Sequence, residues 1–449
     1  MRRLWAAFRQ LKHYPSAIVG LVIVTALLAM TGYSLGAYSY GEIIETWRGG
    51  PHWQDNPRNA SPIWYNWFTT EKLPTTIVRD SRSSSDVVTK TVQSSDELTE
   101  VTITLPFDYR ADGFPKEIAL NLTSTYESKQ PFVTLTWRTA DGREILVTEQ
   151  TVGRSTNINL SQSRELRQKL GGRRPEVGLL AEEGVEPENA TPRKGNYELV
   201  VEGLLFEPDA TMEAKLILYG RVHGIAGTDH KRRDLALGLL WGTPLALAFG
   251  IGGAVGATVF TFIIAAIGAW YGGIVDAIIQ RLTEINLILN LLVVLILVGT
   301  FISSSIWVML GVVIVFSIFS GGIKTYRALF LQVREDPYIE AAQSYGAGNW
   351  RVVWRYMMPR AAPTIVPIFV GAIPGLIFLE ATLAQLGLGD PVLPTWGKII
   401  STARTEGALY QGYYYWMVLP GALLLMAGFS FTMIGLALDR IFNPRLRIE

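Results

Sequence analysis

Long stretches without a charged residue alternate with polar segments along this chain of 449 residues. The uncharged stretches cover residues 16–41, 235–275, 285–323, 361–379 and 413–438. A helix needs about 20 apolar residues to cross a bilayer, so each stretch is long enough for a span. We expect Pro244 to separate a short surface helix at 235–243 from a span at 245–269, and Ser303–Ser305 to divide the next stretch into two spans. The pattern therefore predicts an α-helical polytopic membrane protein with six transmembrane helices.

Residues 41–222 follow a different pattern, in which apolar and polar residues alternate with a period of two. Such alternation, in segments rich in β-branched residues, predicts half-buried strands. The predicted strands are Val87–Gln93, Glu100–Leu105, Glu117–Thr123, Phe132–Arg138, Glu144–Thr148, Tyr197–Phe206 and Met212–Tyr219. Asp141-Gly142 is typical of a hairpin turn, and we expect a short helix and a long loop between residues 166 and 194. This segment is therefore expected to form an all-β, sandwich-like insert between transmembrane helices 1 and 2.

Basic residues beside the spans set the expected orientation. They precede the first span and form their densest cluster between residues 324 and 360. Because cytoplasmic loops carry the excess of Lys and Arg, we expect both termini in the cytoplasm and the β-rich insert on the other side. The expected divisions are a cytoplasmic N-terminus at 1–16, transmembrane helix 1 at 17–40, an extracytoplasmic β-rich domain at 41–222, and a membrane core at 223–449 that includes a cytoplasmic loop at 335–359.

Composition and motifs exclude several classes of function. The chain has no cysteine, which rules out disulfides and thiolate chemistry. It lacks the G-x-x-x-x-G-K-[ST] loop that cradles nucleotide phosphates, since Gly397-Lys398 is followed by Ile399. H-E-x-x-H does not occur, and the basic residues form no continuous stripe for a nucleic acid. His223 and His230 have no third well-spaced ligand, so we expect no metal site.

The polar segment Asp336–Pro359 interrupts the apolar pattern and predicts two short helices joined by glycines. Asp336 suits an N-cap and Pro337 the first helical position. The helical faces are Tyr338, Ala341, Ala342 and Tyr345 before Gly346 and Gly348, and Trp350, Val353, Trp354 and Met357 after them. Pro359 disfavours the α conformation of the residue before it, so we expect the second helix to end there. Small residues beside aromatic ones are typical of a segment that inserts into a groove on a partner.

The same segment resembles the EAA loop of ABC importer permeases. The matching positions are Glu340, Ala341, Ala342, Gly346, Met358 and Pro359, with Met358 in place of the usual leucine. The resemblance implies that Asp336–Pro359, called the coupling stretch below, docks into ATP-hydrolysing subunits. Arg351 and Arg355 are candidate contacts to acidic groups on those subunits, and solvated basic residues are an equally weighted alternative.

Further motifs resemble one branch of that family. They are Gly227-Thr228-Asp229 with Arg233-Asp234 and Gly242, Trp270-Tyr271-Gly272-Gly273 with Asp276 and Arg281, Glu380-Ala381-Thr382-Leu383, Leu386-Gly387-Leu388-Gly389, Trp396-Gly397, Pro420-Gly421 and Asp439…Asn443-Pro444-Arg445. Together they resemble the C-type permease subunit of dipeptide and oligopeptide ABC importers, which implies the type I importer fold. Gly227, Thr228, Asp229 and Asp234 form the family's motif on the outer side. Departures include Arg232 in place of a glycine, Asn290 near a usual proline, and the β-rich insert.

The resemblance implies a non-enzymatic transport subunit in the cell membrane of a prokaryote, which forms half of a path for di- or oligopeptides. It implies four kinds of partner: a second permease subunit, two ATP-binding subunits that hold ATP and magnesium, an extracytoplasmic substrate-binding protein, and the lipid bilayer. The chain itself is expected to bind no cofactor and no nucleic acid. One alternative is the same machine importing oligosaccharides or another solute. The other is a membrane-anchored sensor or adhesion protein with a ligand-binding β-domain, against which the coupling stretch and the six spans argue.

Three polar residues in or near the spans are candidates for the translocation path or a gate. Asn286 and Asn290 stand four residues apart in the third span, where a hydrogen bond to a neighbouring helix is the alternative role. Glu380 lies at the outer end of the fifth span, and a structural hydrogen bond is at least as good an interpretation there.

Overall fold

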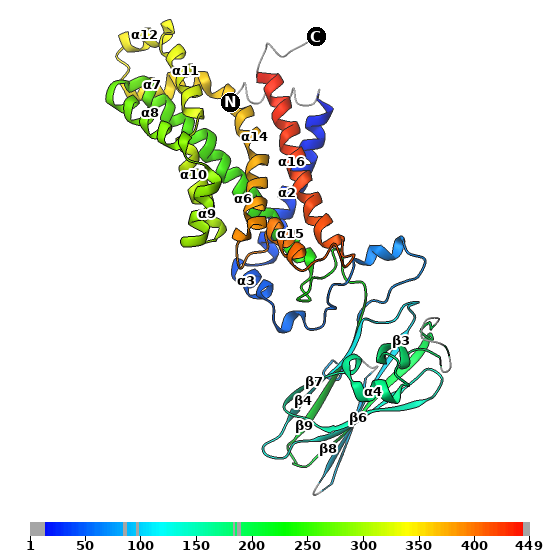
Figure 1. The fold of residues 1–449 in the computed structure, drawn as a ribbon. Coiled ribbons are helices and arrows are strands. Elements are labelled where there is room, and N and C mark those ends of the chain that lie inside the picture. Colours follow the sequence, from blue (N-terminus) through cyan, green and yellow to red (C-terminus); the bar gives the residue numbers. More distant parts are fainter. Residues whose placement is uncertain (1–13, 84–87, 96–97, 183–184, 186–189, 443–449) are drawn as a thin grey trace. The chain divides into compact units, whose positions relative to one another are not determined.

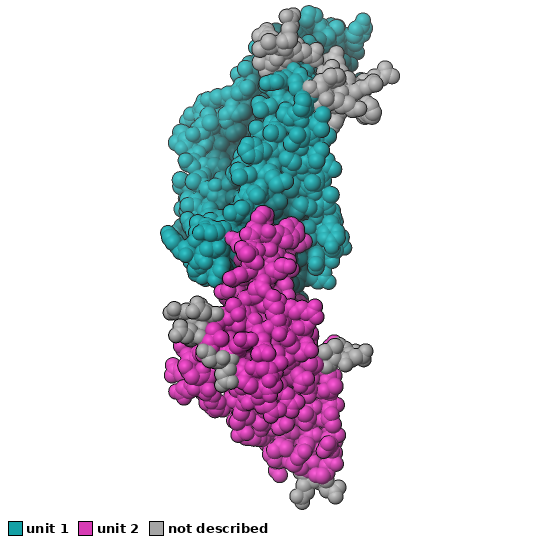
Figure 2. Space-filling view, turned by 90° about the vertical axis from the view of Figure 1, so that its right-hand side faces the viewer, with its two compact units in different colours: residues 1–48, 237–449 teal, residues 49–236 magenta. Residues whose placement is uncertain are grey.

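The computed structural model describes residues 14–442 except 84–87, 96–97, 183–184 and 186–189. Most of the expected N-terminal segment 1–16, Val87 and the motif Asn443-Pro444-Arg445 lie outside the described residues. The chain forms two compact units (Figure 2): Gly49–Ala236, the β unit, and Met1–Arg48 with Leu237–Glu449, the helical unit. These boundaries differ from the expected 41 and 222, because helix α3 (Tyr40–Arg48) packs within the helical unit and residues 223–236 fold with the strands.

The β unit consists of two antiparallel sheets (Figure 1). One has the strand order β1-β9-β4-β7 and the other the order β2-β3-β8-β5-β6. The strands are β1 (Ile77–Asp80), β2 (Thr89–Ser94), β3 (Thr99–Tyr109), β4 (Glu117–Thr125), β5 (Phe132–Arg138), β6 (Glu144–Thr151), β7 (Ser155–Asn159), β8 (Gly195–Leu205) and β9 (Thr211–Tyr219). All seven predicted strands are present, with small shifts at their ends, whereas the alternation does not predict β1 and β7.

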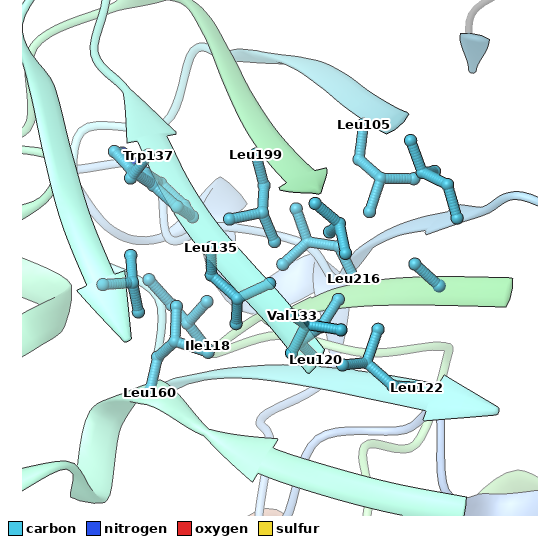
Figure 3. Packing of buried hydrophobic residues seen from close by; sticks show 14 of the residues in the cluster. Leu105, Ile118, Leu120, Leu122, Val133, Leu135, Trp137, Leu160, Leu199 and Leu216 are labelled. Atoms are coloured by element: carbon cyan, nitrogen blue, oxygen red, sulfur yellow. The ribbon is translucent and has the colours of Figure 1, made fainter. Parts of the chain in front are cut away.

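Alternate residues of both sheets bury their apolar side chains in one core. Figure 3 shows Leu105 and Leu199 of one sheet opposite Leu120 and Leu216 of the other. Phe107, Trp137 and Tyr197 add an aromatic cluster to this core, with ring centroids 5.5–6.4 Å apart. The indole N–H of Trp137 donates to a backbone carbonyl in the segment 160–194, and so does the hydroxyl of Tyr197.

That segment closes one side of the core. It carries η4 (Leu160–Gln162), α4 (Arg164–Lys169) and α5 (Pro175–Gly178), where a short helix and a loop are expected. Two further short helices, η2 (Pro51–Trp53) and η3 (Ile63–Trp67), precede β1. The expected sandwich-like arrangement is therefore present, because two sheets share one apolar core.

The helical unit has four helices that are long and apolar enough to cross a membrane, by length and composition. They are α2 (Pro15–Ala37), Leu235–Tyr271, Asn349–Leu388 and α16 (Tyr415–Phe442). Two pairs of helices are also long and apolar enough when each pair is taken together, although each is bent at a short break. They are α8 (Gly273–Ile288) with α9 (Leu291–Phe301), bent by 78°, and α10 (Ile306–Ile318) with α11 (Gly322–Arg334), bent by 43°. The described chain thus has four such helices, or up to six spans if each pair counts as one. Figure 1 shows α12 (Pro337–Ser344) and α15 (Trp396–Thr405) at opposite ends of this unit.

The second long helix continues through its proline. It consists of α6 (Leu235–Ala254), the π-helical turn η5 (Val255–Phe260) and α7 (Thr261–Tyr271). The prediction that Pro244 ends a short surface helix is therefore wrong. Packing against α15 outweighs the hydrogen bond that the proline removes: Trp396 occupies the space beside Gly242 and donates from its indole N–H to the carbonyl of Leu239 at 2.9 Å.

The third long helix also runs past an expected end. It consists of α13 (Asn349–Val352), the π-helical turn η6 (Val353–Met357), α14 (Met358–Leu383) and the π-helical turn η7 (Ala384–Leu388). The prediction that Pro359 ends the second coupling helix is wrong, because Pro359 lies in the first turn of α14. The π-helical turn changes the hydrogen-bond register just before the proline, so its missing N–H breaks no bond of α14. Ser303–Ser305 does separate α9 from α10, as predicted.

A carboxylate joins two loops of the β unit, and this gives a pH prediction. Glu207 accepts hydrogen bonds from the backbone amides of Glu127, Lys129 and Ser128, which lower its pKa from 4.5 to about 2. Because the folded pKa is depressed, the contribution of Glu207 to stability is present above about pH 4.5 and lost as the pH falls toward about 2. We expect Glu207→Gln to speed hydrogen exchange at these three amides at neutral pH, measured by mass spectrometry on the full chain.

The matched control is Glu202→Gln, an exposed carboxylate on β8. It should leave exchange at residues 127–129 unchanged. Equal protection of these amides in the wild type and in Glu207→Gln would contradict the role of the carboxylate.

Candidate functional site

The coupling stretch turns at a glycine that its geometry requires. Helix α12 begins after Asp336, which has the extended backbone of an N-cap without a side-chain capping bond. At its other end, the amide of Gly346 donates to the carbonyl of Gln343 (2.8 Å) and the amide of Ala347 to that of Ala342 (3.0 Å). This pair of bonds forms the Schellman ending of a helix, which needs a left-handed residue. Gly346 supplies it, with φ +79°.

Apolar side chains anchor the coupling stretch to α7 and α11. Ile339, Val352, Val353 and Met357 are at most 1% exposed and belong to one buried cluster with residues of both helices, including Phe262 and Phe330. The aromatic members of the two predicted faces lie outside. Tyr345 is 93% exposed, Trp350 58% and Trp354 41%, and the last two rings pack against each other at 5.5 Å. One side of the stretch is thus fixed to the helical unit, and the other presents aromatic rings.

A polar groove of about 540 Å³ lies beside this aromatic surface. Glu340 lines it together with Trp270, Tyr271, Arg334, Glu335, Asp336, Gln343 and Asn349. Arg334 is held in place, because it donates to the carbonyl of Ala269 at 3.1 Å and lies 6.0 Å from the ring centroid of Trp270. The groove therefore offers an exposed carboxylate, amides and a fixed guanidinium to a partner.

The remaining predicted coupling residues surround this surface. Ala341 and Pro359 are exposed, Ala342 is buried and Met358 is half-buried. Arg351 and Arg355 are exposed and have no hydrogen bond or ion pair to any other described residue. Their guanidinium groups are free to contact acidic groups, and the predicted role of these residues stays a prediction.

An ion pair joins α11, one of the two helices that anchor the coupling stretch, to α8. Arg327 on α11 donates to both carboxylate oxygens of Asp276 at the start of α8, at 2.7 and 2.5 Å. Two parallel N–H···O bonds fix the orientation as well as the distance of the partners. Asp276 follows the turn at Gly272 and Gly273, whose φ angles are +60° and +51°. The segment Trp270–Asp276 thus forms a turn, and its carboxylate forms an ion pair of fixed geometry with α11.

The motif Gly227–Asp234 forms a closed loop around Asp229. This carboxylate is fully buried; it accepts from the backbone amides of Lys231 and Arg233, both at 2.9 Å, and pairs with the Arg233 guanidinium at 2.6 Å. Thr228 is also fully buried and accepts from the amide of Ala60 at 2.9 Å. The carbonyl of Gly227 accepts from the first amide of α6 at 3.0 Å. The motif thus shapes the loop that leads into α6.

Asp234 caps the start of α6 and contacts a histidine. One carboxylate oxygen accepts from the amide of Ala236 at 2.8 Å, and the other lies 3.8 Å from Nε2 of His223. Burial raises the pKa of Asp234 and lowers the pKa of His223. No cluster of three metal-ligating side chains occurs among the described residues.

Arg232, the residue at the family's glycine position, adopts the backbone conformation that glycine favours. Its φ is +67°, in the left-handed region that few non-glycine residues visit. Three contacts hold its side chain: an ion pair to Glu117 at 3.0 Å, a hydrogen bond to the carbonyl of Asn56 at 2.7 Å, and the ring of Tyr219 at 4.0 Å. Its left-handed turn is thus tied to the strands β4 and β9.

Two of the three path candidates make structural hydrogen bonds, and the third is buried beside a helix cap. Asn286 donates to the carbonyls of Phe316 and Phe319, at 3.1 and 3.2 Å, and Asn290 is the N-cap of α9. Glu380 is 5% exposed and lies near Thr395, the N-cap residue of α15. The structure does not bring the three together at one site, and a role in a path stays a prediction for each.

Sequence reasoning missed Asp390, which is 6% exposed. It accepts from the amide of Ile306 at 3.0 Å, at the start of α10, and from two amides of its own loop. Its sequence signal is the pair Asp390-Pro391 directly after a glycine-rich segment. That signal predicts a turn but not the distant helix that the carboxylate caps.

Comparison with known proteins shows what the helical part of the chain is similar to. Residues 257–448, all within the helical unit, match the family described as binding-protein-dependent transport system inner membrane component. A protein of Brucella suis biovar 1 named as a peptide permease is 30% identical over 226 residues, which are 50% of this chain and 74% of that protein. The dipeptide transport system permease protein DppC of Alkalihalophilus pseudofirmus is 28% identical over 224 residues, 49% of this chain and 72% of that protein. The glutathione transport system permease protein GsiD of Pectobacterium atrosepticum is 27% identical over 224 residues, which are 49% of this chain and 72% of that protein.

The contacts of Arg232 predict a graded effect of two substitutions. Arg232→Ala keeps the strained backbone and loses all three contacts, so we expect it to lower the free energy of unfolding by about 1–3 kcal/mol. Arg232→Gly loses the same contacts but relieves the left-handed strain, which is about 1–2 kcal/mol for a non-glycine residue. The glycine variant should therefore be the more stable of the two, measured by denaturant unfolding of the full chain in detergent.

Lys231→Ala is the matched control, because Lys231 is an exposed cation in the same turn. It should change stability little. Equal stability of the alanine and glycine variants would show that backbone strain at residue 232 contributes nothing.

Proposed function

The chain belongs to the family of binding-protein-dependent transport system inner membrane components, and from that premise we propose that its helices form half of a path for di- and oligopeptides in an ABC importer. The family places it in a membrane as a multi-pass transport subunit. The peptide cargo is supported by the names of the relatives, which refer to peptide, dipeptide and glutathione transport. In this proposal each bent helix pair is one span, which gives six spans in total.

The coupling stretch receives the force that moves the path. We place two ATP-binding subunits, which hold ATP and magnesium, against its aromatic surface and against the groove that contains Glu340. The observation that carries this assignment is the division of the stretch into an anchored side and an exposed aromatic side. A partner that binds the exposed rings and moves would displace Val353 and Met357. Because these residues pack against α7 and α11, the displacement would reach both helices.

Helix continuity supports the same mechanism. From Asn349 to Leu388 this helix spans about 60 Å at 1.5 Å per residue, with π-helical turns at 353–357 and 384–388 and a left-handed residue, Gly387, close to its end. The second half of the coupling stretch is therefore the beginning of a membrane helix and not a separate element. A displacement at Trp350 or Trp354 is carried along this helix toward Glu380 and α15.

The β unit belongs to the outer side in this proposal, and both termini lie in the cytoplasm. The support is the basic cluster between residues 324 and 360, which favours the cytoplasmic side. A second permease subunit completes the path. A substrate-binding protein delivers the peptide from outside, in the cell membrane of a prokaryote. The chain itself binds no nucleotide, because it lacks a phosphate-binding loop.

Isolation of the chain with its partners from the native membrane tests the cargo. We expect two ATPase chains, a second permease and a binding protein that retains peptides, identified by mass spectrometry and by peptide binding to the recovered protein. Recovery of the same ATPases with a sugar-binding protein would keep the machine and refute the peptide. Absence of any ATPase after crosslinking would refute the role of the coupling stretch.

Two neighbouring glycines provide a matched test of coupling. An added Cβ meets no atom within 4 Å at either Gly346 or Gly348, but only Gly346 has a positive φ, since Gly348 has φ −66°. Gly346→Ala should therefore strain the turn by about 1–2 kcal/mol, whereas Gly348→Ala should not. We expect Gly346→Ala to lower transport per ATP hydrolysed roughly fivefold or more, measured as uptake and ATPase activity of the reconstituted transporter.

Gly346→Pro should uncouple more strongly, because proline cannot adopt this φ and removes the amide that bonds Gln343. The Gly348→Ala variant should match the wild type. Normal coupling in both Gly346 variants would contradict the assignment of this turn.

A further inference from the structure

Large apolar side chains gather on one small area of the β unit. Trp67 is 81% exposed, Phe68 80% and Ile225 79%. Two chain segments meet here, because the indole N–H of Trp64 donates to the carbonyl of Ile225 at 2.8 Å and the amide of Ile63 bonds to the carbonyl next to it. The rings of Trp64 and Phe68 lie edge to face at 6.3 Å. We call Ile63, Trp64, Trp67, Phe68 and Ile225 the aromatic patch.

No comparable cluster occurs in the rest of the described β unit. Its other exposed large apolar side chains are Val92 on β2, Leu146 on β6 and Phe206 after β8. Single exposed apolar side chains are normal on a protein surface, whereas a contiguous group marks a surface that contacts something apolar. We therefore expect the aromatic patch to contact an apolar surface outside the β unit.

The chain itself fixes the aromatic patch close to the start of a membrane helix. The amide of Leu235, the first residue of α6, donates to the carbonyl of Gly227 at 3.0 Å, and Thr228 pairs with Asp234 beside it. Ile225 precedes Gly227 by two residues, at most about 7 Å of extended chain. The polar layer on each side of the hydrocarbon core is itself roughly 5–8 Å thick. The aromatic patch is thus within reach of the layer through which α6 enters the bilayer.

We propose that the aromatic patch inserts into the outer interfacial layer of the lipid bilayer and holds the β unit to the membrane. Trp and other aromatic residues favour this layer, because the ring leaves water while the indole N–H stays hydrated. Trp67 fits this environment, since its indole N–H has no partner among the described residues. The proposal rests on the membrane helices of the family and not on the peptide cargo or the coupling stretch, so it can fail independently of both.

The absence of cysteine makes a direct test practical. Trp67→Cys, Phe68→Cys and Ile225→Cys are made singly and labelled with a fluorophore in the full chain, assembled with its partner subunits in lipid nanodiscs. The lipids carry a nitroxide quencher near the headgroup. Val92→Cys is the matched control, because Val92 is also apolar and is 55% exposed. We expect several-fold stronger quenching at the three positions of the aromatic patch than at Val92.

Quenching at these positions no stronger than at Val92 overturns the proposal. A second measurement distinguishes lipid from a protein occupant, using nanodiscs that contain this chain alone. Quenching that persists there supports the bilayer. Labels that are buried only in the assembled transporter, and unquenched when the chain is alone, identify another subunit and overturn the proposal. All three positions are exposed and are tested separately, so a folding defect of one variant leaves the other two informative.

Discussion

A backbone N–H or C=O group left unpaired in hydrocarbon costs several kcal/mol, and this cost decides where the helices of this chain can break. Polar side chains close each break. Asn290 accepts from an amide at the start of α9, Asp390 does the same at the start of α10, and Asn286 donates to two carbonyls at the end of α10. Bends of 78° and 43° are therefore compatible with a membrane. The asparagines that stand out in the sequence as path candidates are engaged in shaping the helices, whatever else they do.

The same cost explains why helices of the helical unit continue past prolines. α14 contains Pro363, Pro367 and Pro374 and still runs from Met358 to Leu383. Where hydrogen-bond register must change, the chain uses π-helical turns, which keep most backbone groups paired. One of them lies at residues 353–357, within the coupling stretch itself. The second half of the coupling stretch and the start of α14 thus belong to one helix, and the only left-handed joint of the stretch is Gly346.

Sequence patterns predict this fold best where one local rule dominates. Seven strands follow from alternation, but β7 (Ser155–Asn159) is almost entirely polar and β1 has four residues, so neither has an apolar period to detect. At Pro244 and Pro359 the sequence predicts a helix end that the structure does not have. Local propensity favours a helix end at each, and it is overridden by Trp396 in one case and by a change of register in the other. The coupling stretch is recognisable from its spacing, whereas its buried side depends on α7 and α11, which lie far away in the sequence.

The motif Gly227–Asp234 shows how the turn before α6 depends on the β unit. Asp229 holds the turn through its own carboxylate bonds, and the turn needs a left-handed residue at position 232. Glycine meets that need through conformational freedom. Arg232 meets it at a backbone cost that its contacts to Glu117 and Tyr219 offset. Both contacts come from strands of the β unit, so the β unit itself holds the side chain at this turn. The arginine at position 232 and the strands β4 and β9 are therefore parts of one packed arrangement in this chain.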